Sequence, residues 1–195
     1  MRHQNKRVLD LGSRDKLLKK YLPKDTIYQG IDFKDGEEVK GWNLEQGIPF
    51  EDKSFDVIFA LDVLEHVENI HSLMDEILRV AKNEVIITLP NIYYWRYRIK
   101  FLFGKELSGK YSLPLNKTLD RHRWLTSYLN AIKFIRYKAG SYKVRVFFGK
   151  TSNFLLLSSL EKVLQRAFPN FAAHTIFYHI DLGERAVGDN LLEKN

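Results

Sequence analysis

The fold is decided by the stretch RVLDLGS at residues 7–13, where a short apolar run ends on a glycine. A helix-like stretch follows at residues 16–21, and a second apolar run at residues 27–31 ends on Asp32, twenty residues after Gly12. A strand, a glycine turn, a helix and a second strand ending in a carboxylate form a nucleotide-binding half-unit. Gly12 lets the backbone pass close to a ligand, and Asp32 can accept hydrogen bonds from two ribose hydroxyls.

The turn after Gly12 carries no further glycine, because residues 13–16 read Ser-Arg-Asp-Lys. A loop that cradles a pyrophosphate has the pattern G-x-G-x-x-G. One glycine therefore suits a nucleoside ligand without phosphate better, and S-adenosylmethionine is the obvious ligand of that kind. For the same reason, a nicotinamide-dependent dehydrogenase is the weakest interpretation of this half-unit.

Short apolar runs alternate with helical stretches along the rest of the chain. The runs at residues 8–11, 27–31, 55–61 and 85–89 are typical of buried parallel strands. Apolar residues at helical spacing predict helices at residues 73–81, 126–135 and 152–167, and later strands are expected at 142–148 and 173–180. This alternation predicts one α/β domain over residues 1–195, with helices on both faces of a parallel-rich sheet and a frayed tail at 182–195.

Composition excludes several classes of protein. The chain of 195 residues contains no cysteine, so disulfides, thiolate zinc sites and thiol nucleophiles are ruled out. Its six histidines show no metal-ligand spacing with carboxylates, and we therefore expect no metal site. No apolar run is long enough to cross a membrane, residues 1–6 are too polar and short for a signal peptide, and we expect a cytoplasmic location.

The basic charge is concentrated in one block. Residues 91–150 hold 14 Lys and Arg against two acidic residues, a net charge of +12, whereas residues 1–90 have a net charge of −4. A local basic field suits an anionic partner, although a solvated basic face would look the same. Residues 91–123 are too long for an ordinary connection, and they follow a strand end at Leu89-Pro90. We interpret them as a basic, aromatic lid over the binding crevice.

Several motifs, in order and at the expected spacing, resemble those of class I S-adenosylmethionine-dependent methyltransferases. They are VLDLGS at 8–13, QGID at 29–32, NLE at 43–45, IPFEDKSFDVI at 48–58 and LEHV at 64–67. The segments LPN at 89–91, DRHRW at 120–124 and FPNFA at 168–172 resemble the MetW-like and type 11 methyltransferases. The resemblance covers residues 7–181. It implies a Rossmann-like fold, with a mostly parallel seven-stranded sheet, helices on both faces and an inserted lid after the fifth strand.

The resemblance also implies a cofactor site for S-adenosylmethionine, with S-adenosylhomocysteine as the product. Asp10 and Gly12 would frame the methionine end, Asn43 would read the adenine amino group and Leu44 would pack on the adenine face. The full expected set is Asp10, Gly12, Ser13, Asp32, Phe33, Asn43, Leu44, Leu61, Asp62 and Val63.

The glycine loop departs from the family pattern, which commonly reads D-x-G-x-G-x-G. Arg14 and Lys16 replace two of these glycines. We expect negative φ angles at the substituted positions, or open space for their side chains. Arg14 would either pair with the carboxylate of the cofactor or close the pocket.

Two histidines and the basic aromatic block supply the other candidates. His66 and His122 are candidate general bases, but each can equally be a packing or capping residue. The aromatic and basic residues of the lid are either an acceptor-binding surface or a helix that packs its rings on the sheet. The expected acceptor-binding residues are Tyr93, Tyr94, Trp95, Arg96, Arg98, Arg121 and Arg123.

Three functions remain open. The leading hypothesis is methyl transfer to a small, sugar-linked or lipid-linked anionic acceptor, and peripheral contact with an anionic membrane surface is compatible with the basic block. The second is an RNA or DNA methyltransferase, because basic and aromatic residues together suit phosphates and stacked bases. The third is a non-catalytic MetW-like interaction protein whose loop has lost the cofactor.

Overall fold

The computed structural model describes residues 5–107, 109–113, 116, 121–150 and 155–186, with the backbone alone for residues 155–158. Asp120 of the DRHRW segment lies outside the described residues. In the described part of the chain, no helix has the length and apolar character needed to cross a membrane.

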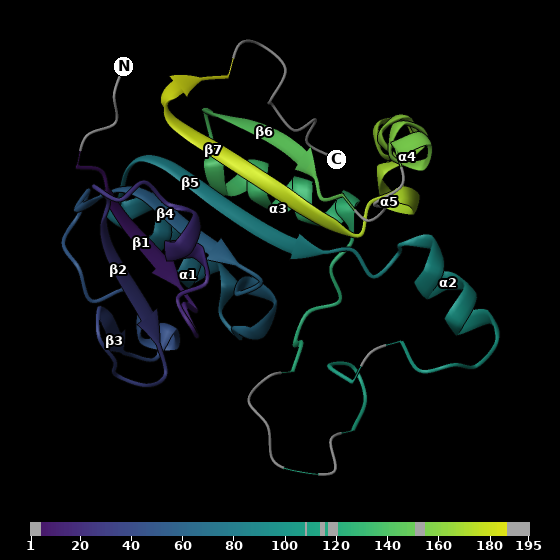
Figure 1. The fold of residues 1–195 in the computed structure, drawn as a ribbon, viewed down its shortest axis with the longest axis horizontal. Helices are drawn as coiled ribbons and strands as arrows, with labels where there is room; N and C mark the ends of the chain where they lie inside the picture. Colours follow the sequence, from purple (N-terminus) through teal and green to yellow (C-terminus); the bar gives the residue numbers. More distant parts are fainter. Residues whose placement is uncertain (1–4, 108, 114–115, 117–120, 151–154, 187–195) are drawn as a thin grey trace.

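The core of the fold is a seven-stranded sheet with the strand order β3-β2-β1-β4-β5-β7-β6 (Figure 1). β7 runs antiparallel to both β5 and β6, and the other neighbours are parallel. The strands are β1 (Arg7–Leu11), β2 (Ile27–Asp32), β3 (Val39–Gly41), β4 (Phe55–Leu61), β5 (Ala81–Pro90), β6 (Tyr142–Phe148) and β7 (Thr175–Arg185). The mostly parallel seven-stranded sheet expected from the sequence is therefore confirmed.

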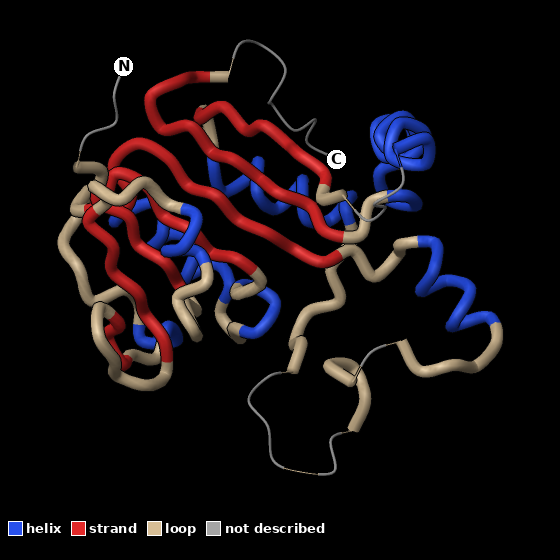
Figure 2. Tube along the Cα trace, in the orientation of Figure 1, coloured by secondary structure: helices blue, strands red, loops and turns tan. Residues whose placement is uncertain are grey.

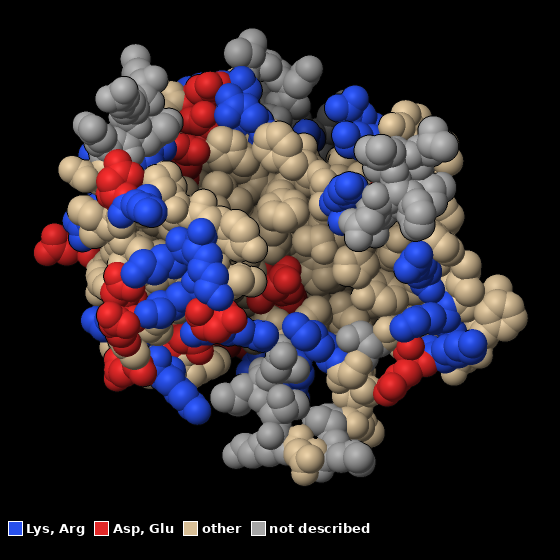
Figure 3. Space-filling model, viewed as in Figure 1, with Lys and Arg blue, Asp and Glu red and all other residues tan. Residues whose placement is uncertain are grey.

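Helices cover the two faces of the sheet unequally. The α-helices are α1 (Ile70–Val80), α2 (Trp95–Leu102), α3 (Tyr128–Ala139), α4 (Leu155–Ala167) and α5 (Pro169–Ala172), and the 3₁₀ helices are η1 (Leu18–Tyr21), η2 (Leu44–Gln46) and η3 (Leu64–His66). α1 and α3 lie behind the sheet in Figure 1, while the near side of β5 and β7 carries no long helix among the described residues (Figure 2). The middle of that near side is a broad surface without charged side chains in Figure 3, and charged side chains border it.

The connection between β1 and β2 forms only the short helix η1 instead of a full helix. None of the residues of η1 is buried, so no apolar stripe holds a longer helix against the sheet. Leu22 already has an extended backbone, with ψ of 153°, and Pro23 follows it. Because a residue before proline avoids the helical region, the chain leaves the helix at this point.

The core lies between the sheet and the helices behind it. Leu9, Ile58 and Ile87 of the central strands are fully buried, as are Ile77 of α1 and Ile135 of α3. This packing explains why short apolar runs became strands while apolar residues at helical spacing became α1 and α3.

The lid is held at both of its ends. Thr126, the first residue of the helix expected at 126–135, lies before α3. Its hydroxyl donates to the Pro90 carbonyl over 2.5 Å, and its own carbonyl accepts the Ile92 amide over 2.9 Å. Ser127 caps α3, and its side chain accepts the Asn130 amide. The insertion therefore leaves and re-enters the fold at one point beyond the end of β5.

The last strand is longer than expected. β7 continues to Arg185, so the first part of the segment expected to be frayed forms a strand. Arg185 pairs with Tyr142 of β6, and its guanidinium stacks 4.6 Å from the centroid of that ring. Residues 187–195 lie outside the described part.

Candidate cofactor and acceptor site

Gly12 forms the turn at the carboxyl end of β1, and only glycine fits there. Its φ is +69°, and a Cβ atom at this position would lie 2.9 Å from Cγ2 of Val63. The amides of Gly12 and Ser13 both donate to the Ile31 carbonyl, over 2.8 and 3.1 Å. The turn is therefore bound to the end of β2 and packs directly against the segment that follows β4.

The loop after Gly12 follows a glycine-like backbone path although it contains no further glycine. Arg14 has φ of +41° and Lys16 has φ of +57°. Of the two alternatives expected at these positions, negative φ angles are not observed, whereas the Arg14 side chain is exposed and has open space. Left-handed backbone costs a non-glycine residue about 1–2 kcal/mol, so surrounding contacts must impose it. One such contact is the Lys16 ammonium group, which donates to the Glu37 carbonyl over 3.1 Å.

Asp32 is held rigidly at the end of β2. One carboxylate oxygen accepts the Arg14 amide over 2.8 Å, and the other accepts the Phe33 amide over 2.7 Å. Each carboxylate oxygen can accept a second hydrogen bond, so the group keeps acceptor capacity for hydroxyls. Phe33 itself is exposed. The Asp32 carboxylate therefore connects the turn after β1 to the end of β2.

Asp10 is a buried carboxyl group close to Gly12. It is 4% exposed, and its Oδ2 accepts the Tyr28 hydroxyl over 2.7 Å. Burial raises the pKa of Asp10 from 3.8 to about 6, against the opposing effect of the Tyr28 hydrogen bond, and the nearby charge of Asp32 adds to the increase. A cation placed beside this group would favour its ionised form.

Asn43 and Leu44 have clear local roles. The Asn43 side chain accepts the Glu45 amide over 3.0 Å and caps η2, as asparagine does in many turns. Leu44 is half-buried and packs against the core. The preceding Trp42 amide donates to the Asp32 carbonyl over 2.7 Å, which brings this segment close to the end of β2. Contact of Asn43 and Leu44 with adenine stays a prediction.

Asp62 adopts a strained conformation just beyond β4. Its φ is +53°, its amide donates to the Thr88 hydroxyl oxygen, and the Thr88 hydroxyl donates to its carboxylate, both over 2.8 Å. Thr88 is buried on β5, so this clasp spans two strands. Strained residues of this kind are often found at ligand sites. Leu61 and Val63 flank it, half-buried and buried respectively.

Side chains expected to bind the acceptor differ widely in their environment. Tyr94 is 6% exposed and packs edge-on against Trp95, so it is a core residue of the lid. The Arg98 guanidinium donates to the Tyr93 carbonyl over 2.7 Å, and Arg123 forms an ion pair with Glu68. These contacts support the packing interpretation for much of the lid.

Arg96 and Arg121 keep exposed side chains. The Arg96 guanidinium lies 5.3 Å from the centroid of the neighbouring Trp95 ring. Tyr93 is 50% exposed. These residues remain the better candidates for contact with an anionic ligand.

His174 is a candidate that the sequence did not reveal. Its Nε2 lies 3.0 Å from the Tyr97 hydroxyl, and its Nδ1 lies 3.0 Å from the Thr175 hydroxyl. Burial lowers the pKa of His174; the charge of Asp62 opposes this shift and that of Arg96 adds to it. His174 precedes β7 and Tyr97 belongs to α2, so no local pattern in the sequence could have linked them to Asp62.

His66 and His122, the two histidines expected as candidate bases, lie against each other. Their rings are perpendicular, with centroids 4.7 Å apart. Both are close to the Glu65 carboxylate, which is 1% exposed. A small cavity of about 200 Å³ adjoins Glu65 between η3, the end of β5 and α3, and Leu64, Leu89, Trp124 and Phe134 contribute apolar walls. Neither Gly12 nor Val63 lines this cavity.

Comparison with known proteins identifies the relatives of this chain. A model of the family described as methionine biosynthesis protein MetW matches residues 1–180. No match was found among curated proteins. The structure is similar to a SAM-dependent methyltransferase from Archaeoglobus fulgidus, with 17% identity, 91% of this chain and 86% of the other covered, and a TM-score of 0.57.

Two further solved structures share the fold. One is a SAM-dependent methyltransferase from Methanosarcina mazei, with 14% identity, 92% and 93% coverage of this chain and the other, and a TM-score of 0.57. The other is phosphoethanolamine N-methyltransferase 2 from Haemonchus contortus in complex with S-adenosyl-L-methionine, with 14% identity, 93% and 49% coverage, and a TM-score of 0.56. These likenesses show the Rossmann-like class I methyltransferase fold, and the family match over residues 1–180 shows that the chain belongs to the MetW family.

Proposed function

We propose that this protein binds S-adenosylmethionine at the carboxyl ends of β1, β2 and β4 and transfers its methyl group to a small anionic acceptor, free or linked to a sugar or lipid. The main support is the backbone path from Gly12 to Lys16. Positive φ angles at Arg14 and Lys16 preserve a glycine-like loop despite the larger side chains. A ligand can therefore approach the backbone of the turn at Gly12.

The charges around the loop suit this cofactor. The sulfonium and ammonium groups of S-adenosylmethionine are cationic, and Asp10 is a buried carboxyl group whose pKa is raised to about 6. A cation beside Asp10 would offset the penalty of its burial. Asp32 would accept the ribose hydroxyls, and the proposed pocket is completed by Ser13, Phe33, Asn43, Leu44, Leu61, Asp62 and Val63.

Chemistry of this kind needs positioning above all. The sulfonium methyl is already activated, so the acceptor must approach in line with the sulfur, at about 3–3.5 Å from the methyl carbon. A base is needed only when the acceptor is a neutral hydroxyl or amine. His174 would then serve, because its lowered pKa keeps the ring neutral and able to take a proton at neutral pH.

The cofactor proposal is tested by calorimetric titration of the protein with S-adenosylmethionine and S-adenosylhomocysteine. We expect saturable binding by the natural protein and at least a tenfold loss of affinity in Asp32→Ala, because two ribose hydrogen bonds to a carboxylate are removed. Asp25→Ala, at an exposed carboxylate in the loop before β2, is the control and should bind normally. Normal binding by Asp32→Ala would contradict the site.

One observation favours a second function, that of a non-catalytic interaction protein. Arg14 and Lys16 introduce two long side chains into the loop that in the family commonly holds glycines. If they fill the pocket, the folded protein will bind neither nucleoside in the same titration. That result would exclude the methyltransferase proposal and leave the lid as the surface for a partner.

A further inference from the structure

Glu65, His66 and His122 come together from two separate parts of the chain. Glu65 and His66 belong to η3, directly after β4, whereas His122 lies near the end of the lid. The Arg123 amide donates to the Glu65 carbonyl over 2.8 Å, which fixes the lid segment against η3. One ligand atom from each of the three residues lies within 4.8 Å of the other two.

The cluster is shielded from water. The side chains of Glu65 and His122 are 1% and 6% exposed. Glu65 Oε1 lies 3.9 Å from His122 Nε2, which is too long for a direct hydrogen bond. A gap of this size between a carboxylate oxygen and an imidazole nitrogen is suited to an ion between them.

The outer contacts of both rings resemble those of metal-bound histidines. His66 Nδ1 lies 2.8 Å from the Arg121 carbonyl, and because a carbonyl only accepts, Nδ1 carries the proton. The neutral ring then has its lone pair on Nε2. His122 Nδ1 lies 2.9 Å from the Tyr111 hydroxyl. Hydrogen bonds at the far nitrogen are what orient histidine ligands in metal sites.

We propose that Glu65, His66 and His122 bind one divalent transition-metal ion, with Zn²⁺ preferred. Two imidazole nitrogens and one carboxylate oxygen match the ligand set of open zinc sites, which keep a fourth position for water or another ligand. Ligand atoms around a tetrahedral Zn²⁺ are about 3.4 Å apart, so the ion would draw the three side chains slightly closer. The site does not depend on the proposed methyl transfer.

The proposal is tested with Zn²⁺ alone, on the full chain after treatment with a chelator. Equilibrium dialysis with elemental analysis should give one Zn²⁺ per chain, and Co²⁺ in its place should give visible absorption bands typical of a tetrahedral site. His122→Ala and Glu65→Gln should each lower the affinity at least tenfold. Tyr111→Phe, which removes only an outer hydrogen bond, should lower it about tenfold.

His179→Ala is a matched control. His179 also contacts a glutamate, with its Nε2 3.2 Å from Glu84, but the pair has no third ligand in the described residues. Its removal should leave Zn²⁺ binding unchanged. A circular dichroism melt checks that each variant is folded, and Tyr111→Phe keeps the test usable if Glu65→Gln does not fold. Absence of saturable binding, or equal binding by folded His122→Ala, would overturn the proposal.

Discussion

The protonation state of Asp10 affects both the free energy of unfolding and the proposed binding of a cationic cofactor. Its pKa is raised from 3.8 to about 6 in the folded protein, so the fold favours the protonated carboxyl group. The corresponding stability is fully present below pH 3.8 and is lost as the pH rises through 6. We therefore expect Asp10→Asn, which retains an acceptor for the Tyr28 hydroxyl, to raise the free energy of unfolding at pH 8 by up to about 3 kcal/mol.

The measurement is urea denaturation of Asp10→Asn and the natural protein at pH 8 and at pH 4. The stability difference should be much smaller at pH 4, where Asp10 is protonated in the folded protein and only partly ionised in the unfolded chain. The same variant should bind S-adenosylmethionine more weakly, because the neutral amide does not attract the cation. An equal difference at both pH values would refute the role assigned to the proton.

Arg14 provides a direct test of backbone strain in the loop. Its φ of +41° is unfavourable for any residue with a Cβ atom. Glycine removes that strain, but it also increases the conformational entropy of the unfolded chain, which lowers the free energy of unfolding by about 0.4–1 kcal/mol. We expect Arg14→Gly to raise the free energy of unfolding by about 0.5–1 kcal/mol, as measured by urea denaturation.

Asp15→Gly is the paired variant, because the φ angle of Asp15 is not positive. There glycine relieves no strain, and stability should fall by about 0.5–1 kcal/mol. Equal losses in both variants would show that Arg14 is not strained.

The individual site residues were predictable to different degrees. Gly12 and Asp32 stand out because their roles depend on neighbours within one strand–turn–strand unit. The cluster of Glu65 with His122 was not foreseen, since nothing in local spacing tells which loops meet in space. The positive φ of Arg14 was also missed, because its amide is held by Asp32 rather than by adjacent residues.

Arg79 connects the last turn of α1 to the loop before β4. Its guanidinium donates to both oxygens of Glu76, to Asp52 over 2.7 Å, and to the carbonyls of Ile48 and Phe50. Lysine keeps the charge but cannot reproduce the planar fork. We expect Arg79→Lys to lower the free energy of unfolding by about 2 kcal/mol.

Lys82 is the control for Arg79, because it lies nearby and carries the same charge. Its side chain is 59% exposed and is 3.9 Å from Asp56. Exposed ion pairs contribute little, so Lys82→Ala should change stability by less than about 0.5 kcal/mol. Thermal denaturation of both variants is the measurement. A large loss in Arg79→Lys with little change in Lys82→Ala shows that the planar guanidinium of Arg79, and not positive charge alone, stabilises this region.

The elements were predictable where burial follows a simple period. Apolar runs predicted the central strands correctly, because α1, α3 and the adjacent strands bury the side chains of these strands. The extension of β7 to Arg185 was missed because its last residues are polar, and the strand is held there by pairing with Tyr142. The helix expected before β2 shortened to η1, because its side chains bury no surface.

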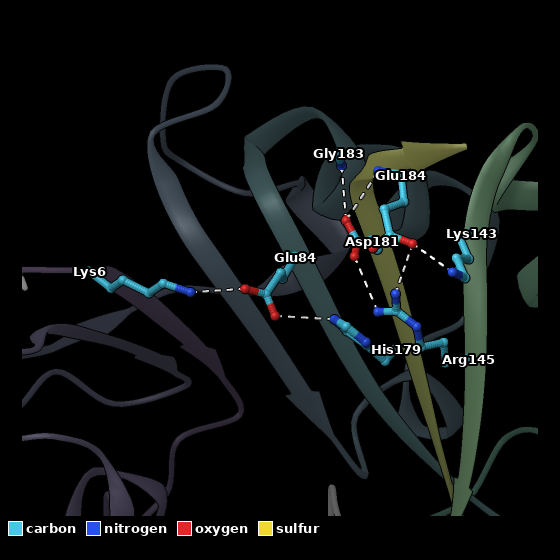
Figure 4. Close-up of polar contacts among 8 residues, drawn as sticks. All are labelled: Lys6, Glu84, Lys143, Arg145, His179, Asp181, Gly183 and Glu184. Carbon is cyan, nitrogen blue, oxygen red and sulfur yellow. Dashed lines mark hydrogen bonds and ion pairs between the residues drawn. The ribbon is translucent and has the colours of Figure 1, made fainter. Parts of the chain in front are cut away.

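Ion pairs join the residue before β1 to β5 and link strands β5, β7 and β6 on the uncovered face of the sheet (Figure 4). Lys6, just before β1, contacts Glu84 of β5 over 2.9 Å, and Glu84 in turn contacts His179 of β7 over 3.2 Å. Farther along the same face, Arg145 of β6 contacts Asp181 over 3.2 Å. These pairs join strands distant in sequence where no long helix covers them.

Two opposing sets of carboxyl groups determine how the stability of the whole molecule depends on pH. The pKa of Glu76 is lowered from 4.5, mainly by hydrogen bonds from Arg79. The pKa of Glu84 is also lowered: burial would raise it, but the Lys6 hydrogen bond and the charges of Lys6 and His179 outweigh burial. Their stabilisation is present above pH 4.5 and is lost as the pH falls through their lowered pKa values. Asp10 acts in the opposite sense between pH 3.8 and 6.

We therefore expect the free energy of unfolding to peak in acid solution, at about pH 4.5, and to decrease on both sides. Urea denaturation across pH 3.5–8 measures this profile. Asp10→Asn should remove the decline toward neutral pH and leave the acid decline, whereas Glu84→Gln should weaken only the acid decline. If Asp10→Asn kept the full decline toward neutral pH, other titrating groups would cause that decline. Ionisation of the buried Asp10 carboxyl group, the proposed partner of the cofactor's cation, would then not lower the free energy of unfolding.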